Sequence, residues 1–402
     1  MNGENKKNVL ICDIGGTNVR FGLYSRNQGD NVVFDGKYKC VEFSSFEEAV
    51  GKYLKMKKEK PTLCVIGAAG DLNEAETEIL VTNTPWKASV PKLKSQFPFL
   101  KHVRMVNDFA LQGWALSELT ADQYRPVFGT QKISLKKGKV VVIGPGTGLG
   151  TCLVMQEGKK QQAIYTSEAG HNTLPYVDFK DRDMNEWRDI LLTGLKKHYA
   201  PQMPITEHIV SGTGISNIYH LCISDSIPKD KKLRIPAEHV ENLAKAGDEN
   251  AIMTFKFFNA YLGAHAGTLA ATTKTKHIFF CGGLMASPWV LGQLEQSPEF
   301  MAQFTERAAL SNAMNSVRFS ASLYRDMSTL GAVVRAKRLL DLDDTEKAKA
   351  RANRDLLFKL TALQAIVEQE GGPEACQTMK KLITSVEKFK KAQQGRGAYH
   401  TR

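Results

Sequence analysis

The chain has 402 residues, of which 42% are hydrophobic and 24% charged, a composition that is typical of a globular enzyme and excludes a fibrous or disordered chain. At about 100–200 residues per domain, this length predicts two or three lobes. We expect neither a membrane span nor a signal peptide, because no apolar run approaches the ~20 residues of a membrane helix. The net charge is +12, and from Lys380 onwards seven lysines and arginines accompany one acid. We interpret this basic tail as a solvated helix face and expect no nucleic-acid contact.

The seven cysteines are scattered and form no C-x-x-C pair, which predicts reduced thiols in a cytosolic protein and neither a disulfide nor a zinc framework. The first third of the chain reads as a mixed sheet flanked by helices. Strands are expected at residues 8–14, 18–26, 37–43, 61–70 and 102–108. Helices are expected at residues 45–60, where Ser45 and Glu48 have capping-box spacing, and at 109–119.

The rest of the chain begins with a polar stretch, residues 119–138, which we predict to be a loop. The segment "KVVVIGPGTGLGTCLVMQ" then repeats the opening pattern of strand, glycine turn and strand, so we expect two related lobes. Residues 185–270 read as mostly helical, and "HIFFCGGLM" as a strand. Residues 328–340 and the polar stretch 341–402 read as helical, with "EGGPE" at 370–374 dividing the last stretch into two helices.

Three glycine-rich turns are candidates for nucleotide binding, because glycine lets backbone amides approach an anion. In "DIGGTNVRFG", Asp13 ends a strand where it could hold a hydrated Mg²⁺, and Gly15, Gly16, Thr17 and Asn18 follow. In "GPGTGLG", the candidates are Gly146, Thr147 and Gly148. In "CGGLM", Gly282 and Gly283 close a strand and open a helix, where a purine could lie against bare backbone.

Each turn has a plainer interpretation, namely a hairpin, a flexible connection or close helix–strand packing. Neither the dinucleotide pattern G-x-G-x-x-G nor a P-loop is present. Four alternating glycines between two clean strands nevertheless need a physical reason, since glycine weakens strand interiors.

Polar residues follow several of the predicted strands. Asn107 and Asp108 stand where a strand ends and a helix begins, so the acid is either a helix cap or a catalytic base. Glu168 and His171 lie in "SEAGH", and Glu207 precedes Ser211, a good helix N-cap. Together these groups match the hydroxyls of a polyol. A metal site formed by Glu168, His171, Glu207 and His208 is the rival interpretation, but its spacing fits no zinc pattern.

The ordered motifs from about residue 8 to 340 resemble the bacterial-type glucokinase family, in the sugar-kinase branch of the actin, hexokinase and 70-kDa heat-shock superfamily. These motifs are "DIGGTNVRFG", "TNTPW", "VNDF", "GPGTGLG", "EAGH", "EHIVSGTG", "CGGLM" and "LGA". The resemblance implies an α/β fold with two actin/hexokinase-like (ribonuclease H-like) lobes, an interlobe cleft and a helical C-terminal extension. The implied domains are residues 1–112 completed by 323–340, then 113–322, and the extension 341–402.

The resemblance further implies an ATP-dependent glucokinase that makes glucose 6-phosphate in the first step of glycolysis. Asp108 matches the family's catalytic base. The family's glucose-binding positions correspond to Asn107, Asp108, Glu168, His171 and Glu207, with Asn83 as a further candidate. ATP, Mg²⁺, a homodimer and a cytoplasmic location are implied as well. The family usually has two glycines between the glutamate and histidine of "EAGH", and here Ala169 takes one place. No cysteine-rich zinc motif follows His171, and residues 341–402 extend beyond the resemblance.

Three alternatives remain at this point. The chain could phosphorylate another hexose, such as mannose or glucosamine. It could be a sugar-sensing regulator on the same scaffold, although only a few residues precede the first strand, too few for a helix-turn-helix. It could also be an ATP-gated module of the chaperone or actin type, which would not require the five sugar-site residues together.

Overall fold

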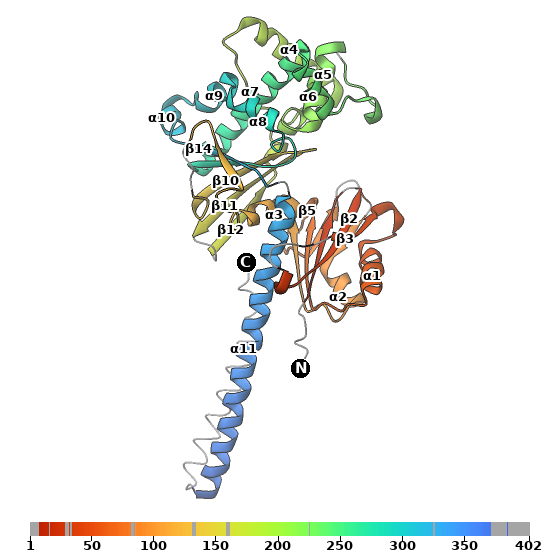
Figure 1. Cartoon of the computed structure of the whole chain (residues 1–402), viewed down its shortest axis with the longest axis vertical. Coiled ribbons are helices and arrows are strands. Elements are labelled where there is room, and N and C mark those ends of the chain that lie inside the picture. The colour runs from red at the N-terminus through yellow and green to blue at the C-terminus, as the bar shows by residue number, and fades with distance from the viewer. Residues whose placement is uncertain are drawn as a thin grey trace. The chain divides into compact units, whose positions relative to one another are not determined.

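Two large sheets organise the chain, and five strands follow the same order and directions in both (Figure 1). The computed structural model describes residues 8–15, 17–28, 32, 34–81, 84, 86–130, 134–157, 161–224, 226–324, 326–370 and 384. Contacts divide the chain into a compact unit of residues 1–337 and a second unit of residues 338–402. Among the described residues, no helix combines the length and the apolar character needed to cross a membrane.

The first sheet has the strand order β3-β2-β1-β4-β8. Its strands are β1 (Val9–Ile14), β2 (Asn18–Tyr24), β3 (Phe34–Lys39), β4 (Leu63–Ala68) and β8 (His102–Asn107). β1 pairs antiparallel with β2 and parallel with β4, and β4 pairs parallel with β8. Helix α1 (Phe46–Lys57) and helix α2 (Val90–Gln96) accompany this sheet, with a small sheet of β5 (Gly70–Leu72), β6 (Glu78–Val81) and β7 (Lys87–Ser89) between them in sequence.

The second sheet has the order β12-β11-β10-β13-β14-β9. Its strands are β9 (Tyr124–Val127), β10 (Lys137–Pro145), β11 (Leu149–Glu157), β12 (Gln161–Ser167), β13 (His277–Phe280) and β14 (Arg318–Ser322). Its antiparallel pair β10–β11 and the parallel strands β13 and β14 repeat the arrangement of β1–β2, β4 and β8. The prediction of two related lobes is therefore confirmed.

Both faces of the second sheet are buried at its central strands β10, β13 and β14, which explains their nearly continuous apolar segments. Val141 and Ile143 belong to one core cluster, and the alternating Val140 and Val142 belong to another. The first cluster lies under the helices gathered at the top of Figure 1, and the second includes residues of α3 (Asp108–Ala115). Those upper helices are α4 (Arg182–Tyr199), α5 (Gly212–Ser224), α6 (Ala237–Lys245), α7 (Glu249–Thr273), α8 (Pro288–Glu295), α9 (Pro298–Thr305) and α10 (Ser311–Met314).

Several predicted boundaries are wrong. The third strand ends at Lys39, where a 3-10 turn follows, and the predicted loop 119–138 contains β9. Gly283 does not open a helix, because α8 begins only at Pro288 after a turn. Strands β5–β7, β12 and β14 and helix α2 were not predicted. The last helix, α11 (Met327–Glu370), is continuous through residue 340, and the proposed break after it lies outside the described residues.

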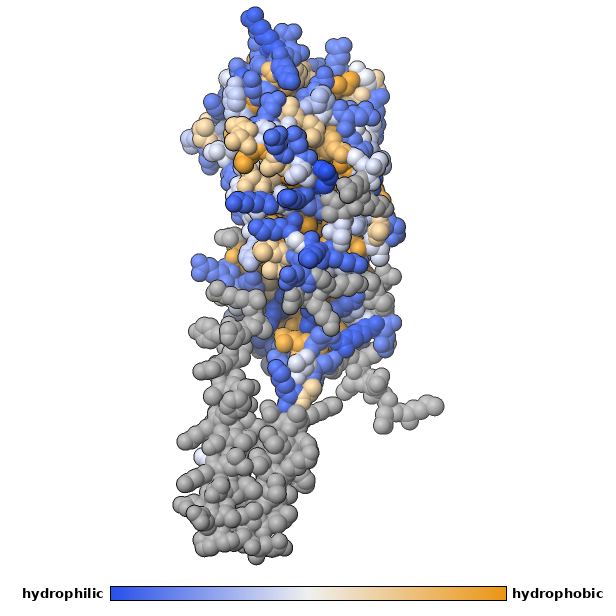
Figure 2. Space-filling view, turned by 90° about the vertical axis from the view of Figure 1, so that its left-hand side faces the viewer, coloured by the Kyte–Doolittle hydropathy of each residue, from blue (hydrophilic) through white to orange (hydrophobic). Residues whose placement is uncertain are grey.

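Helix caps agree well with the sequence. Ser45 caps α1 by accepting the Glu48 N–H at 3.2 Å, and Glu48 in return accepts the N–H of Ser44 at 2.8 Å, not that of Ser45. Ser211 precedes α5 and accepts the Gly214 N–H at 2.9 Å, as expected. On the face that Figure 2 presents, hydrophilic side chains cover much of the surface, with hydrophobic ones between them, as is usual for a protein exterior.

The described cysteines have free thiols, most of which are buried. Cys12 and Cys64 lie on the neighbouring strands β1 and β4. Their sulfur atoms are 4.0 Å apart, and no disulfide joins them. Cys376 lies outside the described residues. The predicted boundary between residues 112 and 113 falls inside α3, and the domain limits stay a prediction.

Candidate active site

The four glycines of the second hairpin have different neighbours. A Cβ atom on Gly144 or Gly150 would lie 2.4 or 2.1 Å from the ring of Phe109. A Cβ on Gly148 would lie 2.5 Å from Oε2 of Glu207, whereas no described atom lies within 4 Å of the corresponding position on Gly146. Two of these glycines therefore make room for an aromatic ring, one makes room for a carboxylate, and only Gly146 faces open space that a ligand could fill.

The first hairpin joins β1 to β2 and places Asp13 opposite Arg20. Arg20 donates to Oδ2 of Asp13 from Nε at 2.7 Å and from a terminal nitrogen at 2.5 Å. The Gly15 N–H closes the turn on the Asn18 carbonyl at 2.9 Å, and Thr17 is exposed. Gly16 lies outside the described residues. Sequence reasoning missed Arg20, although the strand–turn–strand pattern alone pairs positions 13 and 20 across the hairpin.

The third glycine turn lies directly against the second hairpin. Gly282 has a φ of 87°, in the left-handed region that favours glycine, and a Cβ there would meet the Pro145 carbonyl at 2.8 Å. The Leu284 N–H donates to the same carbonyl at 3.3 Å. No described atom lies within 4 Å of a Cβ on Gly283, so this turn borders open space. The predicted phosphate and purine turns of the second lobe are thus neighbours.

The sequence left open whether Asp108 is a helix cap or a catalytic base, and the structure gives the cap to Asn107. Asn107 is the N-cap of α3, and its Oδ1 accepts the N–H groups of Phe109 and Ala110 at 2.9 and 3.3 Å. Asp108 is the first residue of the helix, and its Oδ1 accepts the Phe109 N–H at 2.8 Å. Because the cap is supplied by its neighbour, the half-buried carboxylate of Asp108 is not needed for capping.

Leu149 connects the remaining sugar-site candidates. Its N–H donates to Oε2 of Glu207 at 2.7 Å, and its carbonyl would lie 2.5 Å from a Cβ on Gly170. Glu168 and His171, on either side of Gly170, approach each other to 3.4 Å and are exposed. Glycine is thus required at position 170, whereas Ala169 is buried without such a clash, which explains why the chain tolerates alanine there.

Two 3-10 turns carry these residues and lie side by side. The first covers Ala169–His171 and the second Thr206–His208. They are joined where the Thr206 N–H donates to the Asn172 carbonyl at 2.9 Å. The structure therefore brings Glu168, His171 and Glu207 next to the second glycine hairpin. Asn83 lies outside the described residues.

The electrostatics single out Asp108. Burial raises the pKa of its carboxyl, and the negative charges of Asp13 and Glu168 raise it further. The hydrogen bond from the Phe109 N–H opposes this shift. A carboxyl whose pKa is raised by desolvation at a candidate site is a better proton acceptor than an exposed one. Burial also lowers the pKa of His208, next to Glu207, to about 4, so this histidine is neutral at pH 7.

The segment "SGTG", which entered the sequence analysis only as part of a family motif, anchors the second hairpin. The Gly212 N–H donates to the Gly146 carbonyl at 2.7 Å, and the Thr213 hydroxyl donates to the Thr147 carbonyl at 3.0 Å. Together with the bond between Glu207 and Leu149, these contacts tie the start of α5 to residues 146–149. The signal in the sequence for this anchoring is the glycine-rich start of a helix in "SGTG".

Asp13 is the residue present that could serve Mg²⁺. Both Arg20 bonds go to Oδ2, and Oδ1 takes no part in them. Mg²⁺ usually keeps several waters and takes one or two carboxylates together with substrate phosphates, so a single carboxylate fits it. Within the described part of the chain, no three His, Cys, Asp or Glu side chains gather as a metal cluster.

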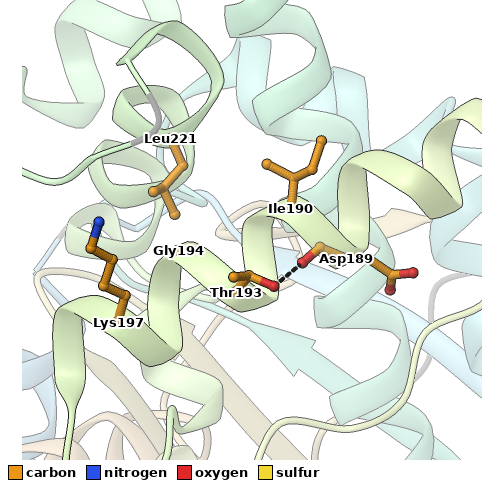
Figure 3. A pocket seen from close by; sticks show the side chains of 6 residues that line it. All are labelled: Asp189, Ile190, Thr193, Gly194, Lys197 and Leu221. Atoms are coloured by element: carbon orange, nitrogen blue, oxygen red, sulfur yellow. Dashed lines mark hydrogen bonds between the residues drawn. The ribbon is translucent and has the colours of Figure 1, made fainter.

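A separate pocket of about 490 Å³ lies between α4 and α5 (Figure 3). Asp189, Ile190, Thr193 and Lys197 of α4 line it, with Leu221 of α5 opposite. None of the residues predicted for the sugar or the nucleotide lines this pocket. It therefore plays no part in the candidate site.

An α/β phosphotransferase of the actin/hexokinase-like class is defined by three features together. They are the duplicated sheets, the two glycine hairpins, and the carboxylates of Asp108, Glu168 and Glu207. The family model "Glucokinase" matches residues 10–339, and the chain belongs to this family. A glucokinase from Caulobacter sp. (strain K31) is 28% identical over 328 residues, which cover 81% of this chain and 94% of that relative.

Solved structures agree on the fold. A glucokinase from Balamuthia mandrillaris in complex with glucose has a TM-score of 0.70 at 18% identity, covering 84% of this chain and 95% of that one. A ROK family glucokinase from Streptomyces griseus in complex with glucose and AMPPNP has a TM-score of 0.53 at 18% identity, covering 81% and 98%.

Proposed function

We propose that this member of the Glucokinase family transfers the γ-phosphoryl group of ATP to the 6-hydroxyl of D-glucose, with Asp108 as the general base. The observation that carries the proposal is the position of Asp108. Its half-buried carboxylate begins α3, and the next residue, Phe109, packs against two glycines of the second hairpin. This contact supports the proposal, because it would hold the proton acceptor close to the proposed phosphate cradle.

In this proposal the 6-hydroxyl oxygen attacks the γ-phosphorus while its proton passes to Asp108, and the bond to the β-phosphate oxygen breaks to release ADP. General-base assistance of this kind contributes about 10²–10⁴ in rate. Asn107, Glu168, His171 and Glu207 hold the sugar hydroxyls, with Asn83 as a further candidate. Mg²⁺, reached by Asp13 through water, would offset charge on the β- and γ-phosphates.

The nucleotide is proposed to lie along the three glycine turns. Gly146 and Gly283 border open space, and the second and third turns touch. The first turn contributes Gly15, Gly16, Thr17 and Asn18, and the second contributes Thr147 and Gly148. Because Glu207 bonds to the second hairpin, we expect sugar and nucleotide binding to influence each other.

A coupled assay with ATP, Mg²⁺ and about six hexoses tests this function. Glucose should give the highest kcat/KM, and the Asp108→Asn variant should bind glucose without turning it over. Faster phosphorylation of mannose or glucosamine would reassign the substrate, and glucose binding without any turnover by the wild type would favour the sugar-sensing regulator. Glucose-dependent release of ADP distinguishes the kinase from an ATP-gated module.

A homodimer, a cytosolic location and the domain limits at residues 112, 322 and 340 remain proposals that rest on the family resemblance. Sedimentation of the purified chain tests the first of them directly. A monomer at high micromolar concentration would contradict it.

A further inference from the structure

Strand β12 forms one end of the second sheet. Residues Gln161–Ser167 pair with β11 along one side, and no other described strand pairs with them. Ala163, Tyr165, Thr166 and Ser167 are exposed, and 56% of Tyr165 is accessible to solvent. An edge strand presents a row of backbone N–H and C=O groups, which is a template for pairing with another strand.

Two other end strands of the large sheets, β3 and β9, are protected in ways that β12 is not. β3, at the end of the first sheet, carries Asp35, Lys37 and Lys39 and has a bulge against β2. β9, at the far end of the second sheet, has four residues, and Arg125 and Pro126 are two of them. Charges, bulges, proline and short length all discourage edge-to-edge pairing. β12, by contrast, has seven residues, "QQAIYTS", with no charge, proline or glycine.

We propose that β12 pairs with β12 of a second copy of this chain, antiparallel about a two-fold axis at Ile164. Ile164 is the middle residue of the strand, so this register pairs all seven residues of both copies. It places Ala163 opposite Tyr165 of the second copy, a small side chain against a large one. It also places Gln162 opposite Thr166, both neutral and polar. The two six-stranded sheets thereby join edge to edge.

The two faces of β12 agree with this register. Ile164 packs against the core cluster that includes α3, and Gln162 donates to the Gly113 carbonyl at 2.9 Å, so this face points inward. Ala163 and Tyr165 lie on the opposite, exposed face, because successive side chains alternate along a strand. These contacts fix the strand in place, and no second strand of the described residues pairs with its outer edge.

The inference rests on the homodimer of the proposed function, but not on the sugar chemistry. The test uses the full chain with Ala163→Lys and Tyr165→Lys together, which opposes like charges twice across the axis. A second variant carries Ala163→Glu and Tyr165→Glu. The matched control, Met203→Lys with Leu233→Lys, adds the same charge at exposed apolar residues elsewhere. Analytical ultracentrifugation measures the dimer dissociation constant, and glucose turnover reports the active site separately.

The wild type and the control should dimerise alike, and each β12 variant alone should dissociate about tenfold more readily. An equimolar mixture of the Lys and Glu variants should restore the dimer, because opposite charges then face each other. If both β12 variants dimerise as the wild type does, the surface is wrong although the homodimer stands. A monomeric wild type would overturn both, whatever its turnover of glucose.

Discussion

Replacement of Asp108 by asparagine removes the proposed base and keeps the shape of the side chain. Asparagine can still hydrogen-bond a sugar hydroxyl, but it cannot take a proton at neutral pH. The loss of general-base assistance should lower kcat by about 10²–10⁴, which is about 3–5 kcal/mol of barrier at ~1.36 kcal/mol per tenfold change. The glucose affinity, measured by isothermal titration, should change little.

The same variant has a second, independent signature in stability. The pKa of Asp108 is raised in the folded state, so the folded protein holds this proton more tightly than the unfolded chain does. The contribution of Asp108 to the free energy of unfolding is therefore greatest below the ordinary carboxyl pKa of about 3.9. It falls as the pH rises through the pKa that Asp108 has in the folded protein. At pH 7 the asparagine variant should be at least as stable as the wild type, because it carries no desolvated charge.

The acid limb of the pH profile completes this prediction. Only the carboxylate form of Asp108 accepts a proton. As the pH decreases, wild-type kcat/KM should therefore begin to fall at a pH above the usual pKa range of an aspartate. Glu186→Gln, an exposed carboxylate-to-amide change on α4, serves as the control and should leave kcat unaltered. The assignment of the base would be refuted if the Asp108→Asn variant turned over glucose within tenfold of the wild type and its kcat/KM still fell at low pH.

Three further changes test other parts of the structure. Gly148→Ala should raise the KM for glucose, because its Cβ would lie 2.5 Å from Oε2 of Glu207 and displace that carboxylate. The control Gly292→Ala has open space around its Cβ and should leave the KM unchanged. Equal KM values for the two variants would contradict the contact. Ser211→Ala removes the cap of α5 and should cost about 1 kcal/mol of unfolding free energy in urea titrations, so an unchanged midpoint would argue against the cap. Burial lowers the pKa of His265 from 6.5 to about 4, so the unfolded chain binds a proton that the folded protein does not. Stability should therefore fall by about 2 kcal/mol between pH 7 and pH 5 through this residue, and His265→Gln should lose correspondingly less over that interval.

Local sequence was sufficient wherever a short segment carried its own signal. The apolar strands on both sides of the first two glycine turns were predicted nearly to their ends, and the caps at Ser45 and Ser211 were predicted as well. The repeated strand–turn–strand pattern also predicted the duplicated lobes. These features depend on burial patterns and backbone chemistry within about ten residues, which the sequence displays directly.

Strands β5–β7, β9, β12 and β14 were missed because they are short or partly exposed, and pairing with distant strands stabilises them more than any local pattern. The tertiary structure alone also assigned the glycines of the second hairpin. Gly144 and Gly150 accommodate a ring from α3, Gly148 accommodates Glu207, and only Gly146 is left to a ligand. Such assignments depend on residues far away in the chain, since Glu207 stands 58 positions from its partner Leu149. The sequence determined which residue types were available for phosphate and sugar, and close packing between distant segments decided which of them face open space.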